Sequence, residues 1–277
     1  MRYMLAAALA ALAVASALDT AAAASPAAYD WSGAYVGAFA GAAVGSSSLS
    51  TVVDCSAYGV LCDPSPHYLN NGLLIGATAS GSASGSAFTG GGFAGRNWQR
   101  GSAVFGFEAD VSALPLDLSN GGSAGTLNLG LYNNNGTVPS VFNVMATAST
   151  DWLVTARFRA GFLPSPNLLL YGTAGIAATE FTVSNSFSDN FNNGVGTGNR
   201  ESSSDAEFRT ALVIGAGMEW AMSRRWRLRA EFLHVDFGSL STAGISTYLP
   251  QVPESSPITS TASLTADIVR AGIAYGF

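Results

Sequence analysis

Several segments of this chain alternate large apolar side chains with a second set made of arginines, carboxylates and glycines. In the run 151–162, Trp152 and Phe158 point to one side of an extended strand, whereas Arg157 and Arg159 point to the other. A water-soluble sandwich would bury its apolar face and scatter its charges over the solvated face. Here the charges recur at the same level in several predicted strands, on the face that also holds glycines. This pattern indicates a narrow polar interior enclosed by an apolar outer wall.

The composition favours a membrane protein. Only 11% of the 277 residues are charged, against about 25% in ordinary soluble domains, and the mean hydropathy is +0.28. After the N-terminus, no run reaches the roughly 18–20 apolar residues that a spanning helix needs. Because lipid tolerates only helices and closed barrels as spanning structures, a barrel becomes the leading interpretation.

The N-terminus is typical of an export signal. Arg2 precedes the apolar run 4–18, and an A-x-A pattern ends at Ala24. A membrane anchor is the alternative, but this run is too short to span a bilayer. The expected divisions are a signal peptide at 1–24, a short N-terminal segment at 25–30 and a barrel domain at 31–277.

Connections of alternating length separate the segments that read as strands. Short connections such as Ser223-Arg224 alternate with long stretches rich in serine, glycine and asparagine. This alternation is typical of an up-and-down barrel with tight turns on one rim and extended loops on the other. The predicted fold class is all-β: an eight-stranded antiparallel up-and-down transmembrane β-barrel with a polar filled lumen, four long extracellular loops and three short periplasmic turns. The predicted strands are 31–44, 87–98, 103–112, 151–162, 168–183, 208–222, 225–237 and 264–277.

Three of these strands, 31–44, 87–98 and 168–183, do not reveal which face meets lipid. In the first, Tyr35 and Phe39 share a face with glycines, and the other face holds alanine and valine. The same run could alternatively form a helix with a small-residue contact face. It is short for a span, and each interior glycine costs a helix about 0.8–1 kcal/mol relative to alanine, which favours the strand.

The inward-facing set of the barrel would combine arginines with carboxylates. Eight strands leave a lumen that side chains just fill, and the planar arginine fork can satisfy two carboxylate oxygens at once. We therefore expect a structural ion-pair network, with a narrow ion path or gate as the alternative. Wide aqueous channels appear only at about 16 strands. The predicted network is Glu108, Asp110, Arg157, Arg159, Glu219, Arg227, Arg229, Glu231 and Arg270.

Other candidate motifs are weak. Cys55 and Cys62 are the only cysteines, and in an exported protein they predict a disulfide that closes a small loop. His67 is the only further ligand near them, whereas zinc usually takes four, so no metal or cofactor is expected. The glycine pattern at 90–95 lacks the strand–helix setting of a phosphate site. No basic cluster lies beside stacking aromatics, which argues against nucleic acid.

The strand pattern is carried by seven stretches, WSGAYVGAFAG, FAGRNWQ, VFGFEADVS, DWLVTARFRAGF, LLLYGTAGIA, GAGMEWAMSRRWRLRAEFLHVDFG and VRAGIAYGF. Together they resemble the small outer-membrane β-barrels of alphaproteobacteria, the outer-membrane immunogenic or porin-like proteins of the outer-membrane protein A-like group. The resemblance implies residence in the bacterial outer membrane and contact with its lipid and lipopolysaccharide. It also implies that Tyr275 and Phe277 belong to a terminal signal read by the outer-membrane assembly machinery. Because the sequence ends at the last predicted strand, we expect no peptidoglycan-binding domain after it, unlike in the longer members of that group.

The functional expectation is a structural, non-enzymatic barrel that contributes to envelope integrity and presents surface loops to host molecules or other ligands. A porin-like channel for small solutes or ions is the first alternative. An outer-membrane lipid-modifying enzyme is the second, but His234 lacks a serine two residues on, which favours a position in the interfacial belt. Haem capture would rely on His67 and Tyr68 in the first long loop.

Overall fold

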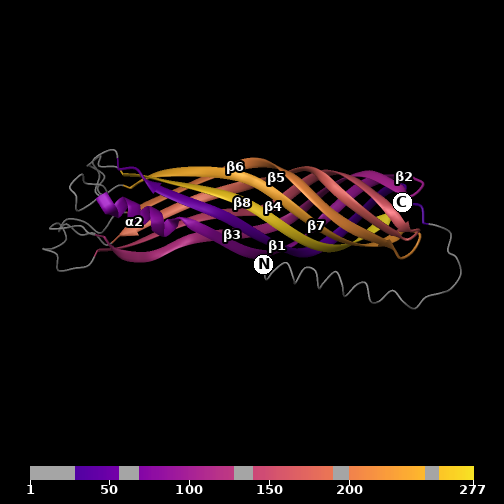
Figure 1. The fold of residues 1–277 in the computed structure, drawn as a ribbon, viewed down its shortest axis with the longest axis horizontal. Helices are drawn as coiled ribbons and strands as arrows, with labels where there is room; N and C mark the ends of the chain where they lie inside the picture. The colour runs from indigo at the N-terminus through magenta and orange to yellow at the C-terminus, as the bar shows by residue number, and fades with distance from the viewer. Residues whose placement is uncertain (1–28, 56–68, 128–139, 190–199, 247–255) are drawn as a thin grey trace.

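The computed structural model describes residues 29–55, 69–127, 140–189, 200–246 and 256–277 (Figure 1). The predicted signal peptide and the positions Cys62, His67 and Tyr68 lie outside these described residues. No helix in the described part of the chain is long and apolar enough to cross a membrane.

Eight antiparallel strands form one closed barrel, in which each strand pairs with its neighbours in the chain and β1 pairs with β8. This confirms the predicted fold class. The pairing of Tyr35 with Gly276 places the start of β1 and the end of β8 on the same rim as the short turns. The elements are β1 (Gly33–Val53), α2 (Leu69–Ala79), β2 (Gly81–Arg100), β3 (Ala103–Leu127), β4 (Ser140–Ser165), β5 (Leu168–Asp189), β6 (Arg200–Ala221), β7 (Trp226–Ser246) and β8 (Ser256–Gly276).

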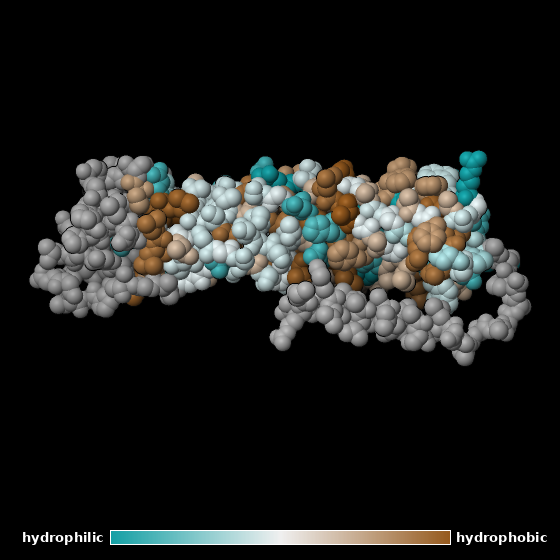
Figure 2. All heavy atoms as spheres, in the orientation of Figure 1, coloured by the Kyte–Doolittle hydropathy of each residue, from teal (hydrophilic) through white to brown (hydrophobic). Residues whose placement is uncertain are grey.

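The half of the barrel next to the short turns, here called the proximal half, has an apolar outer wall. Figure 2 shows hydrophobic residues gathered on this half, at the end opposite α2 in Figure 1, and a second group at the other end beside the grey atoms. Those of the proximal half alternate along each strand with inward charged or small residues, which is the pattern of a lipid-facing surface. Large exposed side chains of this wall include Val36, Trp98, Phe105, Phe107, Val154, Phe158, Ile214, Trp220, Leu228, Phe232, Val269 and Ile273.

The strands are much longer than predicted. β4 has 26 residues and β2 has 20, whereas a membrane crossing takes about 9–11. Much sequence predicted as loop is therefore strand, and β5 and β6 extend into the serine- and asparagine-rich stretch that begins at Ser184. Serine and asparagine have low strand propensity, so composition alone made these extensions look like loops.

Beyond the lipid-facing wall, in what we call the distal half, the two faces of the wall exchange polarity. On β8, Ile258, Ala262 and Leu264 are fully buried, while Thr261 and Ser263 between them lie on the outward face. The lumen lined by arginines and carboxylates therefore lies in the proximal half, whereas a largely apolar core, which also holds polar side chains such as those of Asn185, Glu201 and Thr242, fills the distal half. Further buried members of this core are Leu114, Leu116, Leu118, Phe142, Val144, Leu153, Phe181, Val183, Phe187, Val213, Leu233 and Val235.

The distal half is also split along two seams. The ladder between β2 and β3 runs only from Arg100–Ala103 to Gly90–Ala113, and that between β6 and β7 ends at Leu212–Asp236. Past these points β2 stays paired with β1 and β6 stays paired with β5. The closed barrel thus continues as two facing four-stranded sheets, β7-β8-β1-β2 and β3-β4-β5-β6, with the apolar core between them.

Helix α2 covers one side of this core near the distal end (Figure 1). Its Ile75 and Ala79 are fully buried and belong to the apolar core. Ser80, just after the helix, accepts a hydrogen bond of 2.9 Å from the backbone N–H of Thr51, and Asn120 Nδ2 reaches the Thr78 carbonyl at 3.5 Å. The helix is thereby tied to both sheets, through β1 on one and β3 on the other.

Because this core is apolar, truncating a buried phenylalanine should lower the free energy of unfolding far more than truncating an exposed one. Phe181→Ala removes a fully buried ring and should lower the free energy of unfolding by about 3–5 kcal/mol. Phe88→Ala, at a ring that is 79% exposed on the distal part of β2, is the matched control and should change it by about 0.5 kcal/mol or less. Urea unfolding of the refolded barrel, followed by tryptophan fluorescence, measures both; equal losses would contradict a distal apolar core.

Candidate functional site: a buried ion-pair network in the lumen

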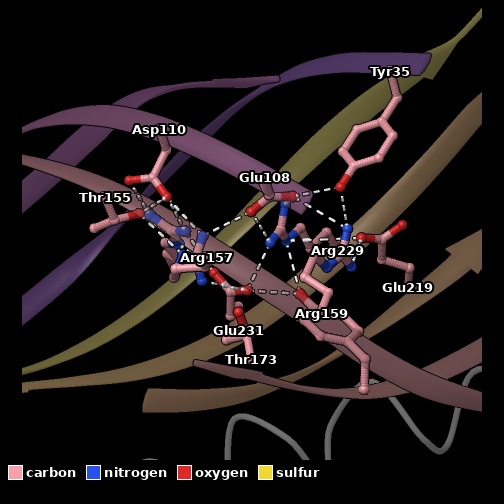
Figure 3. A network of polar contacts seen from close by, with 12 residues as sticks. Tyr35, Glu108, Asp110, Thr155, Arg157, Arg159, Thr173, Glu219, Arg229 and Glu231 are labelled. Atoms are coloured by element: carbon pink, nitrogen blue, oxygen red, sulfur yellow. Dashed lines mark hydrogen bonds and ion pairs between the residues drawn. The ribbon is translucent and has the colours of Figure 1, made fainter. Parts of the chain in front are cut away.

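Strand register brings the charged residues of the proximal half to one level of the lumen. Glu108 lies opposite Arg157 across β3 and β4, Glu219 opposite Arg229 across β6 and β7, and Glu231 opposite Arg270 across β7 and β8. Figure 3 shows most of these side chains converging on the barrel axis. All nine residues of the predicted network point inward, and none is more than 5% exposed.

Glu108 is one centre of the network. Arg229 donates to both of its carboxylate oxygens, with Nη–O distances of 2.6 and 2.7 Å. Arg157 Nη2 donates to Oε1 at 2.7 Å, and the Tyr35 hydroxyl donates to Oε2 at 2.9 Å (Figure 3). Such paired, charge-assisted hydrogen bonds fix both partners and join β1, β3, β4 and β7 across the lumen.

Glu231 and Asp110 form the part of the network nearer the distal half. Arg270 donates through Nε to Glu231 Oε2 at 2.7 Å and through Nη2 to Asp110 Oδ2 at 3.0 Å. Arg157 reaches the same two carboxylates, at 3.1 and 2.6 Å, and Thr155 donates to Asp110 at 2.7 Å. Asp110 therefore meets two arginines, and Glu231 meets three, because Arg229 Nη2 also donates to its Oε1 at 2.6 Å.

Glu219 lies nearer the short turns and is less completely satisfied. It accepts a short hydrogen bond from Arg159 Nη2, and Arg227 Nη1 lies 3.2 Å from its Oε2. Among the described residues, Glu219 Oε2, Arg159 Nε and Arg227 Nε have no hydrogen-bond partner of good geometry. This end of the network is held more by charge and ring contacts than by directed hydrogen bonds.

Aromatic rings complete the lumen, and sequence reasoning left their orientation open. Arg159 stacks over Tyr171 at 3.9 Å from guanidinium carbon to ring centroid. Arg270 lies over Phe39 at 4.0 Å, and Arg227 lies over Tyr35 at 4.4 Å. These rings share an inward face with glycines, so the alanine–valine face of β1 is the one that meets lipid.

The signal for this orientation is the pairing of a large ring with a glycine on the next strand. A Cβ placed on Gly95 of β2 would come within 2.5 Å of the Tyr35 hydroxyl. Only glycine leaves room for a ring that crosses a narrow lumen. Aromatic residues and glycines on one face therefore mark the inside of a filled barrel.

The network can hold charge but offers no open reactive group. It contains five arginines and four carboxylates, 5 − 4 = +1, and the ring faces give the arginines further favourable contacts. Within the described residues, no group of three or more His, Cys, Asp or Glu side chains is arranged to hold a metal ion. The geometry fits a cross-brace between strands.

The remaining predicted positions lie outside the lumen. Cys55 is disulfide-bonded, while its predicted partner Cys62 falls outside the described residues. His234 Nδ1 lies 2.7 Å from Asp267 Oδ1, with both side chains exposed at the distal edge of the apolar wall, just past Phe232 and Val269.

The last strand ends in a cluster of rings at the proximal rim. The backbone N–H of Phe277 donates to the Ala34 carbonyl at 3.1 Å, which extends the pairing of β8 with β1. The Tyr275 ring packs edge-on against Trp226 and Phe277, and its hydroxyl accepts a hydrogen bond of 2.7 Å from Arg225. Ring belts of this kind mark a membrane–water interface.

A closed eight-stranded barrel with a lipid-facing wall and a charged, filled lumen defines an outer-membrane β-barrel protein. The chain belongs to the outer membrane protein beta-barrel domain family, whose model matches residues 6–277. It is 28% identical over 151 residues to the 31 kDa outer-membrane immunogenic protein of Brucella melitensis, covering 54% of each chain. It is 30% identical over 147 residues to the 22 kDa outer membrane protein of Rhizobium leguminosarum, covering 53% of this chain and 51% of that one.

The chain spans about half the length of these curated relatives. Among solved structures it is similar to OprG of Pseudomonas aeruginosa, with 9% identity, a TM-score of 0.42 and coverage of 91% of this chain and 99% of that one. It is also similar to Neisserial surface protein A, with 11% identity, a TM-score of 0.31 and coverage of 89% and 98%. The family match places the protein in the outer membrane of a Gram-negative cell and confirms the resemblance to the immunogenic proteins.

The network predicts that removing one central carboxylate destabilises the barrel strongly. Glu231→Leu leaves Arg270, Arg229 and Arg157 short of a partner and should lower the free energy of unfolding by about 3–5 kcal/mol. The matched control is Glu207→Leu, which breaks an exposed pair with Arg209 and should cost about 1 kcal/mol or less. The readout is the temperature at which the folded band disappears in a heat-modifiability gel. An unchanged temperature for Glu231→Leu would show that this residue does not brace the barrel.

Proposed function

We propose that this protein is a non-enzymatic structural component of the outer membrane, a solid pillar that supports envelope integrity and presents its loops outside the cell. The observation that carries the proposal is a lumen filled at three successive levels. Trp31, Leu169 and Tyr171 pack together near the short turns, the ion-pair network follows, and the apolar core fills the distal half.

The length of the strands supports the role in presentation. After about 9–11 residues cross the membrane, strands of 20–26 residues leave a distal half that rises on the order of 25–35 Å at the usual rise and tilt. The long connections between strands begin at the far end of this distal half. Loops carried at that height would be accessible to host molecules or other ligands.

The outer surface of the distal half supports contact with lipopolysaccharide. On β8 and the neighbouring β1, the outward residues are mostly hydroxyls, including Thr261, Ser263, Ser48 and Ser50. Some already bond one another or the backbone, as Ser263 does with the N–H of Ser48 at 3.0 Å. Hydroxyls donate and accept hydrogen bonds, so such a wall suits the sugar layer above the outer leaflet.

A channel is the first competing function, and the filled lumen argues against it. We expect the refolded protein in planar bilayers to give no sustained conductance, because charged and aromatic side chains occupy the axis of an eight-stranded barrel. A porin of known conductance, inserted in the same bilayers, is the positive control. Sustained, ion-selective openings of defined size would contradict the proposed structural role and favour a channel.

The proposed envelope role has its own test. A strain that lacks the protein should admit more of a hydrophobic fluorescent dye, because a stiff element would be missing from the membrane. The wild-type protein should restore the barrier to the dye. Glu231→Leu, present in the outer membrane in the same amount, should restore it only partly, because its ion-pair network is incomplete. Equal dye entry with and without the protein would contradict a role in envelope integrity.

An enzymatic role would have to use the exposed pair of His234 and Asp267. In the register of the outer wall, His234 lies between Asp267 of β8 and Ile214 of β6. Neither neighbour supplies the hydroxyl or thiol that a His–Asp pair would activate. The pair is better explained as a polar contact at the distal edge of the lipid-facing wall.

A further inference from the structure

Four buried oxygen atoms without hydrogen-bond partners gather near the seam between β6 and β7 in the distal half. They are Asn185 Oδ1, Glu201 Oε1, Ser203 Oγ and Thr242 Oγ1, none of which has a partner among the described residues. Asn185 and Thr242 are each 1% exposed, and Glu201 is 7% exposed. Buried polar atoms are nearly always satisfied, so a group of four in one region points to a missing partner.

Strand pairing places these oxygens close together. Asn185 lies directly opposite Ser203 in the ladder of β5 and β6, and Asn185 Nδ2 donates to Glu201 Oε2 at 3.3 Å. The Glu201 side chain crosses the seam to β7, where a Cβ on Gly244 would overlap its Oε1 and lie 2.9 Å from the Ser203 Cβ. Thr242 is two residues before Gly244 and faces the same interior. The Glu201 carboxylate thus lies against the β7 backbone at Gly244, beside Ser203 of β6 and Asn185 of β5, and we call this position the cradle.

The cradle contains a negative charge that the described side chains do not neutralise. The ladder between β6 and β7 ends at Leu212–Asp236, so at the level of Glu201 the seam is bridged by side chains alone. Arg200 lies on the opposite face of β6, because successive side chains alternate. Arg209 is paired with Glu207 at 2.8 Å. A buried carboxylate with no opposite charge is costly, so a cation from solution would stabilise this position.

We propose that a calcium ion binds in this cradle and joins β6 to β7 across the seam. A set made only of oxygens, with one carboxylate, one amide and two hydroxyls, suits a hard cation whose remaining positions are taken by water or backbone carbonyls. Calcium tolerates the irregular geometry of such a set better than magnesium does. A single carboxylate gives weak affinity, with a Kd of about 10⁻⁴–10⁻³ M as in extracellular calcium modules, which suits a site outside the cell.

A proton on the Glu201 carboxyl group, in place of a bound calcium ion, is the competing explanation for the unpartnered oxygens of the cradle. Burial raises the pKa of Glu201 above its ordinary value of 4.5. The Ser203 hydroxyl lies beside the carboxylate and opposes part of this rise, although the two groups form no hydrogen bond of good geometry. A raised carboxyl pKa gives stability that is present at low pH and is lost as the pH rises through the folded value. Calcium takes the place of the proton at neutral pH, so its affinity should increase from pH 5 to pH 7.5.

The charged side chains nearest the cradle lie on β5 and β6. On the packed elements they are Asp189 on β5 and Arg200 and Asp205 on β6. The described inner faces of β7 from Phe237 to Gly244 and of β8 from Ser256 to Ala266 contribute no charged side chain. Among the described residues, Glu201 is therefore the one charged side chain of the cradle itself.

The test uses the full-length barrel refolded in detergent without lipopolysaccharide, stripped with EDTA and titrated with calcium chloride by calorimetry and thermal unfolding. We expect saturable binding with a Kd of about 10⁻⁴–10⁻³ M and a rise in the unfolding temperature with added calcium. Glu201→Gln, which is nearly isosteric, should weaken binding at least about tenfold. Glu180→Gln, at an exposed carboxylate on the outer face of β5, is the matched control and should bind as the wild type does.

Two further variants keep the proposal testable if Glu201→Gln folds poorly. Thr242→Val removes one ligand oxygen at constant shape and should weaken binding, while Asn185→Asp adds a charge and should strengthen it. The proposal fails if the wild type does not bind calcium, or if Glu201→Gln and Glu180→Gln bind equally. It also fails if the wild type is destabilised between pH 5 and pH 7.5 and calcium does not reverse the loss, because the cradle would then hold a proton only. None of these readouts depends on conductance or dye entry, so they can fail independently of the pillar function.

Discussion

Closure of the backbone ladder between β1 and β8 is the constraint on which the rest of this structure depends. The two strands pair from Tyr35–Gly276 to Val53–Ile258, so no strand edge is left for hydrocarbon to desolvate. With eight strands, closure leaves an interior only as wide as the side chains that line it. The interior must therefore be packed, and arginines, carboxylates and rings pack it with their own charges largely neutralised. Closure and filling are two consequences of the same strand count.

The exchange of polarity between the proximal and distal halves follows from the medium outside the wall. Where hydrocarbon surrounds the barrel, apolar residues such as Phe158 and Leu228 point outward and charges are sheltered inside. Beyond the hydrocarbon, Phe181 and Leu264 point inward and hydroxyls such as that of Thr261 point outward. The alternation has a period of two in both halves, and its sign changes between them. On β4 and β7 its phase also slips, because Leu153 and Thr150, and likewise Phe237 and Leu240, are buried three residues apart. Register shifts at Ala113/Leu116, Ser149/Val154 and Asp236/Ser239 lie near this transition, where bulges allow strands to bend.

The sequence predicts the structure best where the two faces of a strand differ clearly in polarity. Arg157 and Arg159 between Trp152 and Phe158 identify a membrane strand and its inward face without coordinates, and the lumen residues follow from that alternation. Tyr35 and Phe39 gave no such contrast, because glycine and alanine differ little in hydropathy. The distal extensions were missed because serine and threonine alternate there with small apolar residues, as at 256–266. The seams depend on where two consecutive strands lose their pairing, and nothing local in the sequence encodes that.

The split of the distal half into two sheets has a further consequence for how this protein tolerates change. The connection between β3 and β4 leaves and re-enters the same sheet, and so does the connection between β5 and β6. Foreign peptides grafted into either connection would rest on a base whose hydrophobic interior and membrane anchor are complete without them. The barrel and its distal core would in this respect support a grafted segment whose own sequence contributes nothing to their packing.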